Sequence, residues 1–439
     1  MKTIKHFPHD DATNGWSKIL PDRTPKPPLR ADATADWVVV GGGFAGLSAA
    51  RRLAENRPND KVVLVDASEA GENASGRNSG FAIGVSHNQD GSPDQLEKSS
   101  RHIRLVRASI DYNEAIIERH NIQCDWNRCG KYHAAVTPRG TDEILVPLMK
   151  ELDALGEPYR LVEGDDLRAE IGTSHFTAGV YTPGCVLMNP AALCRGLADS
   201  LPDNISYYEK TPVTGVDYTN GITLTTSRGS VRAPKMILTV NGCVEQFGFF
   251  KGRLLNFAAH CSLSRRLTTE ERAALGGNDE WGLIPTYGFV GITMRLTRDQ
   301  RLLIRQNVHF KPGKNVSDAK RAAVKREHQK LFDQRFPMLP EVTMEHTWTG
   351  YVCVSQNSTP GFGRVALNVY TAICQNSGGV TKGTIAGMLA ADKACGKDNP
   401  LIADIEKQGT PNKLPLRPFL DLGVHTRLAW DLFKRRYEA

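Results

Sequence analysis

Three observations predict the fold class, an α/β protein with a Rossmann-type nucleotide-binding domain and a second, α+β domain built on an antiparallel sheet. Residues 37–40 form an apolar, β-branched run that breaks directly into glycines, as a buried parallel strand entering a turn does. Residues 61–65 are a second run of this kind. Residues 252–310 instead alternate apolar and polar side chains, which is typical of antiparallel strands with one solvated face.

The glycine turn after the first strand points to a ligand. Gly41, Gly43 and Gly46 have the spacing G-x-G-x-x-G, and the small residues that follow predict a helix from Leu47 to Glu55. In such a turn the first glycine bends the chain, the second lets a pyrophosphate approach the backbone, and the third lets the helix pack on the strand. The N–H groups at the start of the helix then face the phosphates.

An acidic residue at the end of the second strand completes the pattern. Asp66 lies twenty positions after Gly46, where a carboxylate accepts hydrogen bonds from a dinucleotide ribose. Strand, glycine turn, helix and acid together favour a dinucleotide site over an ordinary strand–turn–helix unit. We therefore expect the cofactor to contact Gly41, Gly43, Phe44, Ala45, Gly46, Asp66 and Ala67.

Length, composition and charge narrow the class of protein. The chain has 439 residues, of which 40% are hydrophobic, and this length favours two domains. No apolar run approaches the roughly 20 residues that span a bilayer, so we expect a soluble, cytoplasmic protein without integral membrane contact. The nine cysteines are scattered, which predicts neither a disulfide framework nor a metal site. The net charge of +7 is interspersed with acids, and the basic run 434–436 is typical of a solvated helix end rather than of nucleic-acid binding.

The order of the expected elements divides the chain. An N-terminal arm covers residues 1–35 and a C-terminal extension covers 396–439. The nucleotide-binding domain takes 36–92, 156–245 and 345–395, and the substrate domain takes 93–155 and 246–344. Helices are expected at 93–120, 142–155, 191–201, 316–332 and 384–394. Strands are expected at 131–136, 159–162, 205–208, 212–218, 221–226, 235–240, 254–263, 289–296, 301–308, 347–354 and 369–374.

Two glycine-rich loops follow strands of the nucleotide-binding domain. Residues 70–80 leave the second strand at the carboxyl edge of the sheet, where ligands bind, and Arg77 could meet a phosphate or a carbonyl of the cofactor. Residues 375–383 lead a later strand into the helix at 384–394. A helix start of this kind stabilises negative charge on a bound group.

These stretches resemble one family. The arm around Trp16, the glycine turn, the loop 74–80, the helix start 189–191, the strand pair 295–304, and the segments 348–350, 360–363 and 377–381 carry the resemblance. On them the chain is similar to the FAD-dependent amine and amino-acid oxidases of the D-amino-acid oxidase superfamily, and within it to the bacterial gamma-glutamylputrescine oxidoreductases.

The resemblance implies FAD as the cofactor and extends the set of residues that would contact it. The added positions are Ser75, Gly76, Arg77, Asn78, Ser79, Gly80, Val213, Asn241, Gly242, Gly363, Gly378, Gly379, Val380, Thr381 and Lys382. In the family the turn at 377–381 places a helix start against the pyrimidine ring of the flavin. Three positions depart from the usual pattern of the family: Asn357, Arg305-Gln306 and Ser377-Gly378-Gly379. These departures affect the predicted identity of the substrate more than that of the cofactor.

The resemblance also implies a reaction. A small-molecule amine or amino-acid derivative would lose a hydride to the flavin, and the imine would hydrolyse; oxygen or an electron acceptor would reoxidise the cofactor. The expected catalytic residues are Arg305, His260 and Tyr287. Arg305, Arg295 and His260 would hold a carboxylate or tune the amine. Tyr287 and Trp348 would wall the flavin, and His87 is a further candidate. A flavin-dependent monooxygenase or reductase that uses NAD(P)H, and a catalytically impaired scaffold, stay open as alternatives. The oligomeric state is open too.

Overall fold

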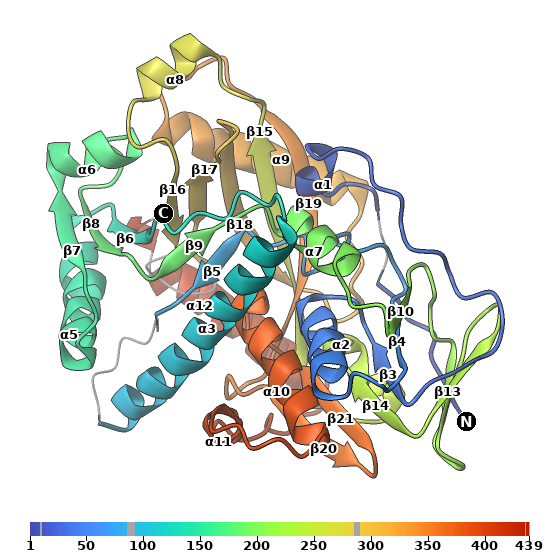
Figure 1. Ribbon diagram of the computed structural model, residues 1–439. Helices are drawn as coiled ribbons and strands as arrows, with labels where there is room; N and C mark the ends of the chain where they lie inside the picture. Colours follow the sequence, from blue (N-terminus) through green and yellow to red (C-terminus); the bar gives the residue numbers. More distant parts are fainter. Residues whose placement is uncertain (9–10, 86–92, 285–289, 435, 439) are drawn as a thin grey trace.

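The computed structural model describes residues 1–8, 11–85, 93–284, 290–434 and 436–438. Two large sheets organise the molecule, and Figure 1 shows them side by side, with strands β3, β4, β10 and β14 in one and β15 to β19 in the other. The predicted combination of a nucleotide-binding sheet with a second, mainly antiparallel sheet is confirmed.

The first sheet has six strands. In spatial order they are β10 (Ile205–Tyr208), β4 (Val62–Val65), β3 (Trp37–Val40), β14 (Lys235–Leu238), β21 (Val369–Ile373) and β20 (Gly361–Ala366). The first five run parallel, and β20 pairs antiparallel with β21. The chain leaves β3 toward β4 on one side, while β14 lies on the other side. A crevice for a ligand is therefore expected at the carboxyl ends of β3 and β14.

Both faces of this sheet are covered. Helices α2 (Phe44–Asn56) and α10 (Thr384–Ala394) pack on one face, and Trp37 and Val39 point into their core. Val38 and Val40 point into the opposite core, beneath a small sheet. That sheet holds β1 (Lys2–Thr3), β11 (Gly215–Asp217), β12 (Ile222–Thr225), β13 (Ser230–Ala233) and β2 (Ala33–Thr34). Two covered faces explain why β3 is apolar at every position.

The second large sheet has eight strands. In spatial order they are β19 (Met344–Val354), β15 (Leu255–Ser264), β18 (Leu302–Phe310), β17 (Thr293–Leu296), β16 (Trp281–Ile284), β6 (Lys131–Ala135), β8 (Ala178–Thr182) and β7 (Arg160–Glu163). Helix α9 (Asp318–Arg335) covers one face and buries Phe332 among residues of β16, β17 and β18. The other face is turned toward the nucleotide-binding sheet, as the cluster of Trp16, Cys261 and Trp348 shows.

The remaining elements are shorter or lie outside the sheets. They are α1 (Gly15–Lys18), β5 (Phe81–Ile83), α3 (Pro93–His120), α4 (Pro138–Gly140), η1 (Thr141–Leu145), α5 (Val146–Leu155), α6 (Gly164–Ile171), β9 (Cys185–Leu187), α7 (Pro190–Asp199), η2 (Asn241–Phe247), α8 (Thr269–Leu275), η4 (Gly379–Gly383), α11 (Leu401–Glu406), α12 (Phe419–Lys434) and η5 (Arg436–Glu438). Within the described ranges no helix is long and apolar enough to cross a membrane.

The structure revises the division of the chain. Residues 156–182 were predicted in the nucleotide-binding domain, but β7 and β8 lie in the eight-stranded sheet. Helix α3 was predicted in the substrate domain, yet its Leu105, Ile110 and Ile116 pack into the core of α2 and α10. These boundaries were wrong because the predictions assumed that neighbouring elements share a sheet, whereas the chain crosses between the sheets after α3 and again after β8.

Candidate active site

A cavity of about 240 Å³ lies at the carboxyl ends of β3 and β14. Its walls come from segments far apart in the sequence: the N-terminal arm, the first glycine turn, the loop after β4, the end of β14, strand β19 and the turn after β21. The lining residues that bear on the argument are Gly41, Gly43, Asp66, Asn241, Gln375 and Gly379. This is the crevice predicted from the strand order.

The glycine turn has the geometry that a bound pyrophosphate requires. Gly41 has φ of +106°, a conformation that favours glycine. A Cβ at Gly46 would lie 1.6 Å from the carbonyl oxygen of Gly41, so α2 can approach β3 this closely only without a side chain there. Gly43 caps α2 without any side-chain hydrogen bond, and a Cβ on it would meet Ser75 Oγ at 2.6 Å. The turn therefore fits a dinucleotide phosphate against the start of α2.

Asp66 lies in the wall of the cavity, half-buried. Its carboxylate accepts hydrogen bonds from the N–H of Gly42, at 2.5 Å, and from the N–H of Ser68, at 2.7 Å. Burial raises the pKa of Asp66 to about 6, and the nearby Glu209 carboxylate adds to the rise. The buried hydroxyl of Tyr207 has no hydrogen-bond partner in the described chain and lies close to Gly42. This end of the cavity thus offers a carboxylate to a polar ligand, and the buried Tyr207 hydroxyl lies near it outside the cavity wall.

The opposite end of the cavity is formed by the turn after β21. Gln375, Ser377, Gly379 and Gly383 line it, and the side-chain nitrogen of Gln375 is buried without a hydrogen-bond partner among the described residues. Asn241 fixes the turn, since its Oδ1 accepts a hydrogen bond of 3.0 Å from the N–H of Cys374. A buried donor left unpaired costs free energy, so Gln375 fits a ligand that carries an acceptor at this place.

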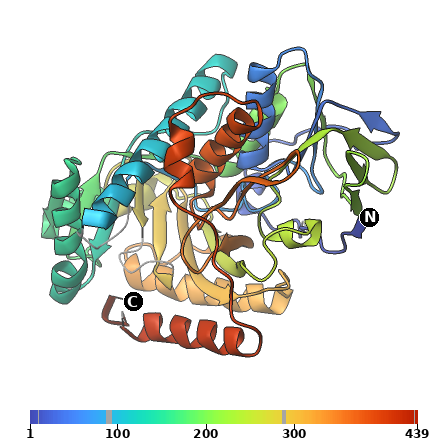
Figure 2. The same cartoon turned by 90° about the horizontal axis from the view of Figure 1, so that it is seen from below.

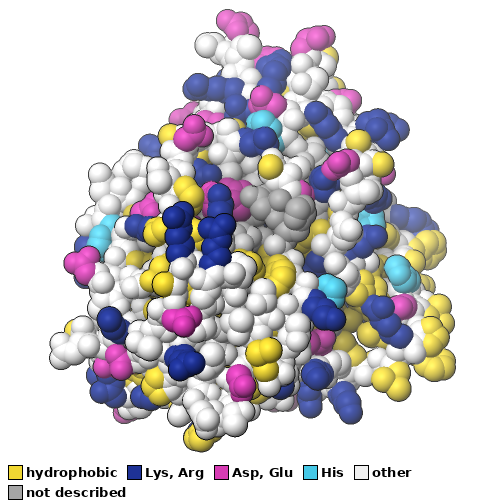
Figure 3. All heavy atoms as spheres, turned by 90° about the vertical axis from the view of Figure 1, so that its right-hand side faces the viewer, with side chains coloured by type: hydrophobic (Ala, Val, Ile, Leu, Met, Phe, Trp, Pro, Cys, Tyr) yellow, Lys and Arg dark blue, Asp and Glu magenta, His cyan; other side chains and the backbone are white. Residues whose placement is uncertain are grey.

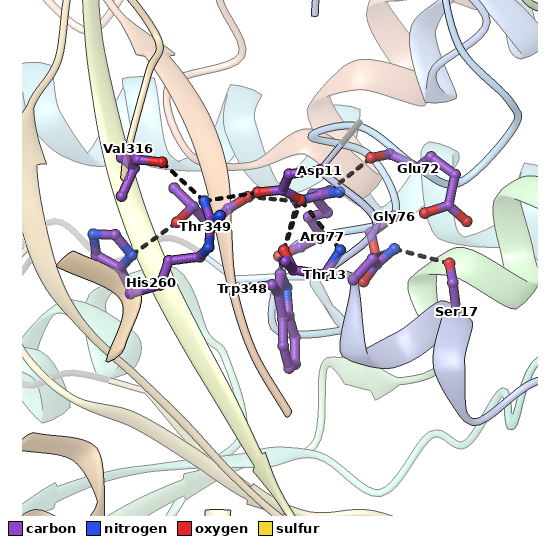
Figure 4. Close-up of polar contacts among 12 residues, drawn as sticks. Asp11, Thr13, Ser17, Glu72, Gly76, Arg77, His260, Val316, Trp348 and Thr349 are labelled. Atoms are coloured by element: carbon purple, nitrogen blue, oxygen red, sulfur yellow. Dashed lines mark hydrogen bonds and ion pairs between the residues drawn. The ribbon is translucent and has the colours of Figure 1, made fainter. Parts of the chain in front are cut away.

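Arg77 joins three parts of the protein, as Figure 4 shows. Its guanidinium forms an ion pair with Asp11 of the arm at 2.7 Å and donates to the carbonyl oxygens of Glu72, at 2.6 Å, and Thr349, at 3.2 Å. Asp11 also pairs with Arg321 of α9 at 3.0 Å. The hydrogen bond from Thr13 and the two arginines lower the pKa of Asp11 against the opposing effect of burial. These contacts are with the protein and Arg77 is not in the cavity wall, so its predicted contact with the cofactor stays a prediction.

The loop 74–80 is attached to the second sheet by two further side chains. Trp348 donates from Nε1 to the carbonyl oxygen of Arg77 at 3.0 Å. Arg295 donates to the carbonyl oxygens of Gly80 and Met188, each at 2.8 Å, and pairs with Glu280 at 2.9 Å. Arg295 is almost fully buried in these contacts, so it positions the loop rather than facing the cavity.

The candidates for contact with the substrate lie on different faces of the eight-stranded sheet. His260 is fully buried on the α9 side, where its ring contacts His309 and its Nδ1 lies 3.0 Å from Thr349 Oγ1. Burial, with His309 next in effect, lowers its pKa to about 3. The hypothesis that His260 holds substrate was wrong in its geometry, because strand alternation points its neighbour Cys261, and not His260, toward the nucleotide-binding domain.

Arg305 lies on the face of the eight-stranded sheet that is turned toward the nucleotide-binding domain. It pairs with Cys261 across β15 and β18, and its neighbour Leu303 packs with Trp348 beneath the loop 74–80. Its Nη1 donates to the carbonyl oxygen of Gly291 at 3.1 Å. Tyr287 and His87 lie outside the described residues. Arg295 lies on the same face but donates to Gly80 and Met188, so of the two candidate cations on this face Arg305 is the one that does not hold the loop 74–80.

The structure brings together about half of the expected cofactor residues. Those that line the cavity are Gly41, Gly43, Phe44, Ala45, Asp66, Ala67, Ser75, Asn78, Val213, Asn241 and Gly379. The cavity wall does not include Gly46, Gly76, Arg77, Ser79, Gly80, Gly242, Gly363, Gly378, Val380, Thr381 or Lys382. Several of these act through packing, because a Cβ at Gly76, Gly80 or Gly242 would lie within 2.2 Å of a neighbouring atom. Lys382 turns away toward His102, and burial lowers its pKa.

Sequence reasoning missed other lining residues. Thr211, Val240, Tyr351, Cys353 and Gln375 reach the cavity from strands and turns without a recognisable motif. The N-terminal arm also contributes to the cavity wall, through Ile4, His6 and Phe7. The signal for Gln375 was available: it directly precedes a glycine-rich turn at the end of a buried strand. Asn357, noted as a departure, binds Thr410 and Asn412 of the C-terminal extension and is not in the wall.

Comparison with known proteins decides the family. A family model described as DAO, FAD dependent oxidoreductase, matches residues 36–393. The chain belongs to this family. It is therefore an FAD-dependent oxidoreductase, and FAD is the cofactor that the glycine turn and the cavity must accommodate.

Individual members of the DAO family align over most of their length. The chain is 26% identical over 392 residues to the probable oxidoreductase OrdL of Haemophilus influenzae, covering 85% of this chain and 86% of the relative. It is 28% identical over 408 residues to gamma-glutamylputrescine oxidoreductase of Escherichia coli, covering 89% of each. Glycine oxidase from Geobacillus kaustophilus shares the fold, with a TM-score of 0.69 at 18% identity, 84% of this chain and 96% of that one being covered.

Proposed function

We propose that this oxidoreductase oxidises a C–N bond of an amine or amino-acid derivative to an imine, which then hydrolyses. The names of its relatives support this, since they include gamma-glutamylputrescine oxidoreductase, glycine oxidase and, at a TM-score of 0.66 and 16% identity, an iminodiacetate oxidase. When bound, FAD supplies the acceptor for the hydride, a hydrogen with its electron pair, that leaves the substrate carbon. The protein must bind and orient the two partners and keep water away.

Different residues of the cavity would bind different parts of FAD. We infer that Gly41, Gly43 and the start of α2 hold the pyrophosphate, and that Asp66 accepts hydrogen bonds from the ribose. Gln375 would donate its unpaired side-chain N–H to the ring end of the cofactor. The start of the helix formed by η4 and α10 lies at the same end and favours negative charge there.

Arg305 carries the substrate assignment. It lies on β18, on the sheet face toward the FAD domain, and β15 separates it from β19, which carries Tyr351 of the cavity wall. A guanidinium in that place suits a carboxylate of the substrate, which it binds with two parallel hydrogen bonds. We therefore favour an amino-acid derivative, with Arg305 on the carboxylate, over a simple polyamine.

Anaerobic reduction of the bound flavin tests the proposal. The holoenzyme is mixed, in the absence of oxygen, with N-alkyl amino acids, polyamine conjugates, D-amino acids and NADPH in turn, and the flavin absorbance is followed. The proposal predicts bleaching by at least one carboxylate-bearing amine and none by NADPH. Rapid bleaching by NADPH alone would instead establish a reductase or monooxygenase, and bleaching by none of the amines would contradict the assignment.

A further inference from the structure

Helix α12 presents an apolar stripe to the outside. Leu416, Phe419, Leu422, Trp430 and Phe433 keep 83%, 74%, 69%, 58% and 57% of their surface exposed. Because each residue advances about 100° round a helix, the last four fall within an arc of about 80°. Half-buried Leu420, Val424 and Leu428 occupy the opposite side, toward the protein. Large apolar patches on a surface mark interaction sites, whereas single exposed residues do not.

The orientation of the helix is fixed from both ends. Before α12, Leu414 donates its N–H to the carbonyl oxygen of Gly252 at 2.8 Å, and Arg253 donates to that of Pro411 at 2.6 Å. After it, the buried carboxylate of Glu438 accepts from the N–H of Val136 at 2.6 Å and from Thr137 Oγ1 at 2.6 Å. These contacts on both sides of α12 hold the stripe outward. Figure 2 shows α12 along the outer edge of the molecule.

The charges around α12 indicate which kind of partner could cover the apolar stripe. Residues 411–438 hold six Lys and Arg against three Asp and Glu, and Glu438 is buried. Asp421 and Asp431 are paired with Arg417 and Arg427. Exposed Lys434 lies at the edge of the stripe, and Arg436 stacks on Phe433 with 4.0 Å between its guanidinium and the ring. Apolar side chains gather with Lys and Arg at the right-hand edge of Figure 3, on the side of the molecule where α12 lies.

A second copy of the chain matches this surface poorly. A two-fold axis would set α12 against α12, either parallel or antiparallel. In both cases a cationic end meets a cationic end, because Lys413 precedes the helix and Lys434 to Arg436 end it. An anionic bilayer has the complementary charge, and Trp, Phe and Leu on one face with Lys and Arg beside them are what an interfacial helix carries.

We propose that α12 is a peripheral docking surface for an anionic lipid bilayer, with Phe419, Leu422, Trp430 and Phe433 entering the interface and Lys434 and Arg436 meeting lipid phosphates. This contact would hold the body of the enzyme against a membrane surface. This inference is independent of the proposed substrate.

Sedimentation with vesicles tests the proposal on the full-length holoenzyme. Vesicles of phosphatidylcholine alone are compared with an equimolar mixture of phosphatidylcholine and phosphatidylglycerol. We expect binding to the mixed vesicles, weakened when NaCl is raised because the headgroup charges are screened. The double variant Phe419→Ser/Trp430→Ser should bind at least tenfold more weakly. Leu367→Ser, which removes an equally exposed apolar residue from the β20–β21 hairpin, should bind like the parent.

Two further readouts keep the test decisive. The flavin absorbance shows that each variant is folded, and Trp430 fluorescence in the parent should shift to the blue and be quenched by brominated lipid. Absence of binding to either vesicle, or equal binding of the double variant, would overturn the proposal. So would a dimer in light scattering that the double variant dissociates, since the stripe would then face a second copy.

Discussion

The two ends of the FAD cavity are built in different ways. The end at Asp66 comes from one continuous stretch, β3, the glycine turn, α2 and β4, within thirty residues. The end at Gln375 is assembled from the close of β14, strand β19 and the turn after β21, which are more than twenty residues apart in every case. The first is a local motif with a fixed spacing. The second depends on two sheets meeting, so its residues have no spacing to recognise.

The largest effect should come from the local end. Gly46→Val places side-chain atoms where even a Cβ would be 1.6 Å from a backbone oxygen, and no rotamer relieves that contact. We expect the variant to retain less than about a tenth of the parent's FAD after purification, because the shift of α2 also moves its N-terminal N–H groups. FAD per chain, from absorbance, is the measurement.

Gly313→Ala is the matched control for that experiment. A Cβ at Gly313 would meet nothing within 4 Å, so FAD content should stay at the parent's level. Full FAD content in Gly46→Val would show that the turn does not need this close approach.

The next largest effect concerns the contact between the two sheets. Arg77→Met removes the donor that holds Asp11, Glu72 and Thr349 together and leaves buried acceptors unpaired. Breaking a buried ion pair of this kind costs about 3 kcal/mol or more. We expect a fall of several degrees in the melting temperature and faster proteolytic cleavage of the N-terminal arm.

An exposed arginine provides the comparison. Arg417 pairs with Asp421 on the surface, and a pair of that kind contributes about 0.5 kcal/mol. Arg417→Met should therefore leave the melting temperature and the proteolysis of the arm unchanged. Equal effects of the two substitutions would remove the special role given to Arg77.

Arg305→Met tests whether Arg305 binds the carboxylate of the substrate. Loss of hydrogen bonds to a charged group costs about 1.5–3 kcal/mol, which is roughly a 10- to 100-fold fall in kcat/KM for a carboxylate-bearing amine. FAD content should not change, because Arg305 is outside the cavity wall. A matched substitution at Arg301, which pairs with Glu345, should leave kcat/KM intact. An unchanged kcat/KM in Arg305→Met would move the carboxylate site elsewhere.

The smallest effect is a pH dependence at Asp66 in the FAD-free protein. Its pKa is raised to about 6 from an ordinary value near 4, so the fold favours the protonated carboxyl. The corresponding stability is complete below the ordinary value and is lost as the pH rises through 6. We expect the melting temperature of the parent, relative to Asp66→Asn, to fall between pH 4 and pH 7. A difference that stays constant over this range would contradict the raised pKa.

Sequence patterns predicted the local parts of the fold and missed those that depend on topology. The run 37–46 and helix α7 after Asn189 were confirmed because each has its own turn or cap chemistry. Asp66 lies directly after β4, and its contact with a ribose stays a prediction. His260 was misplaced because period-two alternation shows that neighbouring residues face opposite ways, but not which of them faces the cofactor. The bulge in the pairing of β15 with β18 near His260 adds to the difficulty. The glycine-rich turn that follows Gln375 marked its surroundings in the sequence, but that its side-chain N–H is buried without a partner is visible only in three dimensions.

An experimental structure with FAD tests the central claim most directly. The account predicts density for one FAD per chain, with a ribose hydroxyl at hydrogen-bond distance from Asp66 and an acceptor of the flavin ring at that distance from Gln375 Nε2. Density with the ring end at Asp66, or a cavity that stays closed by its own side chains after FAD is added, would contradict it.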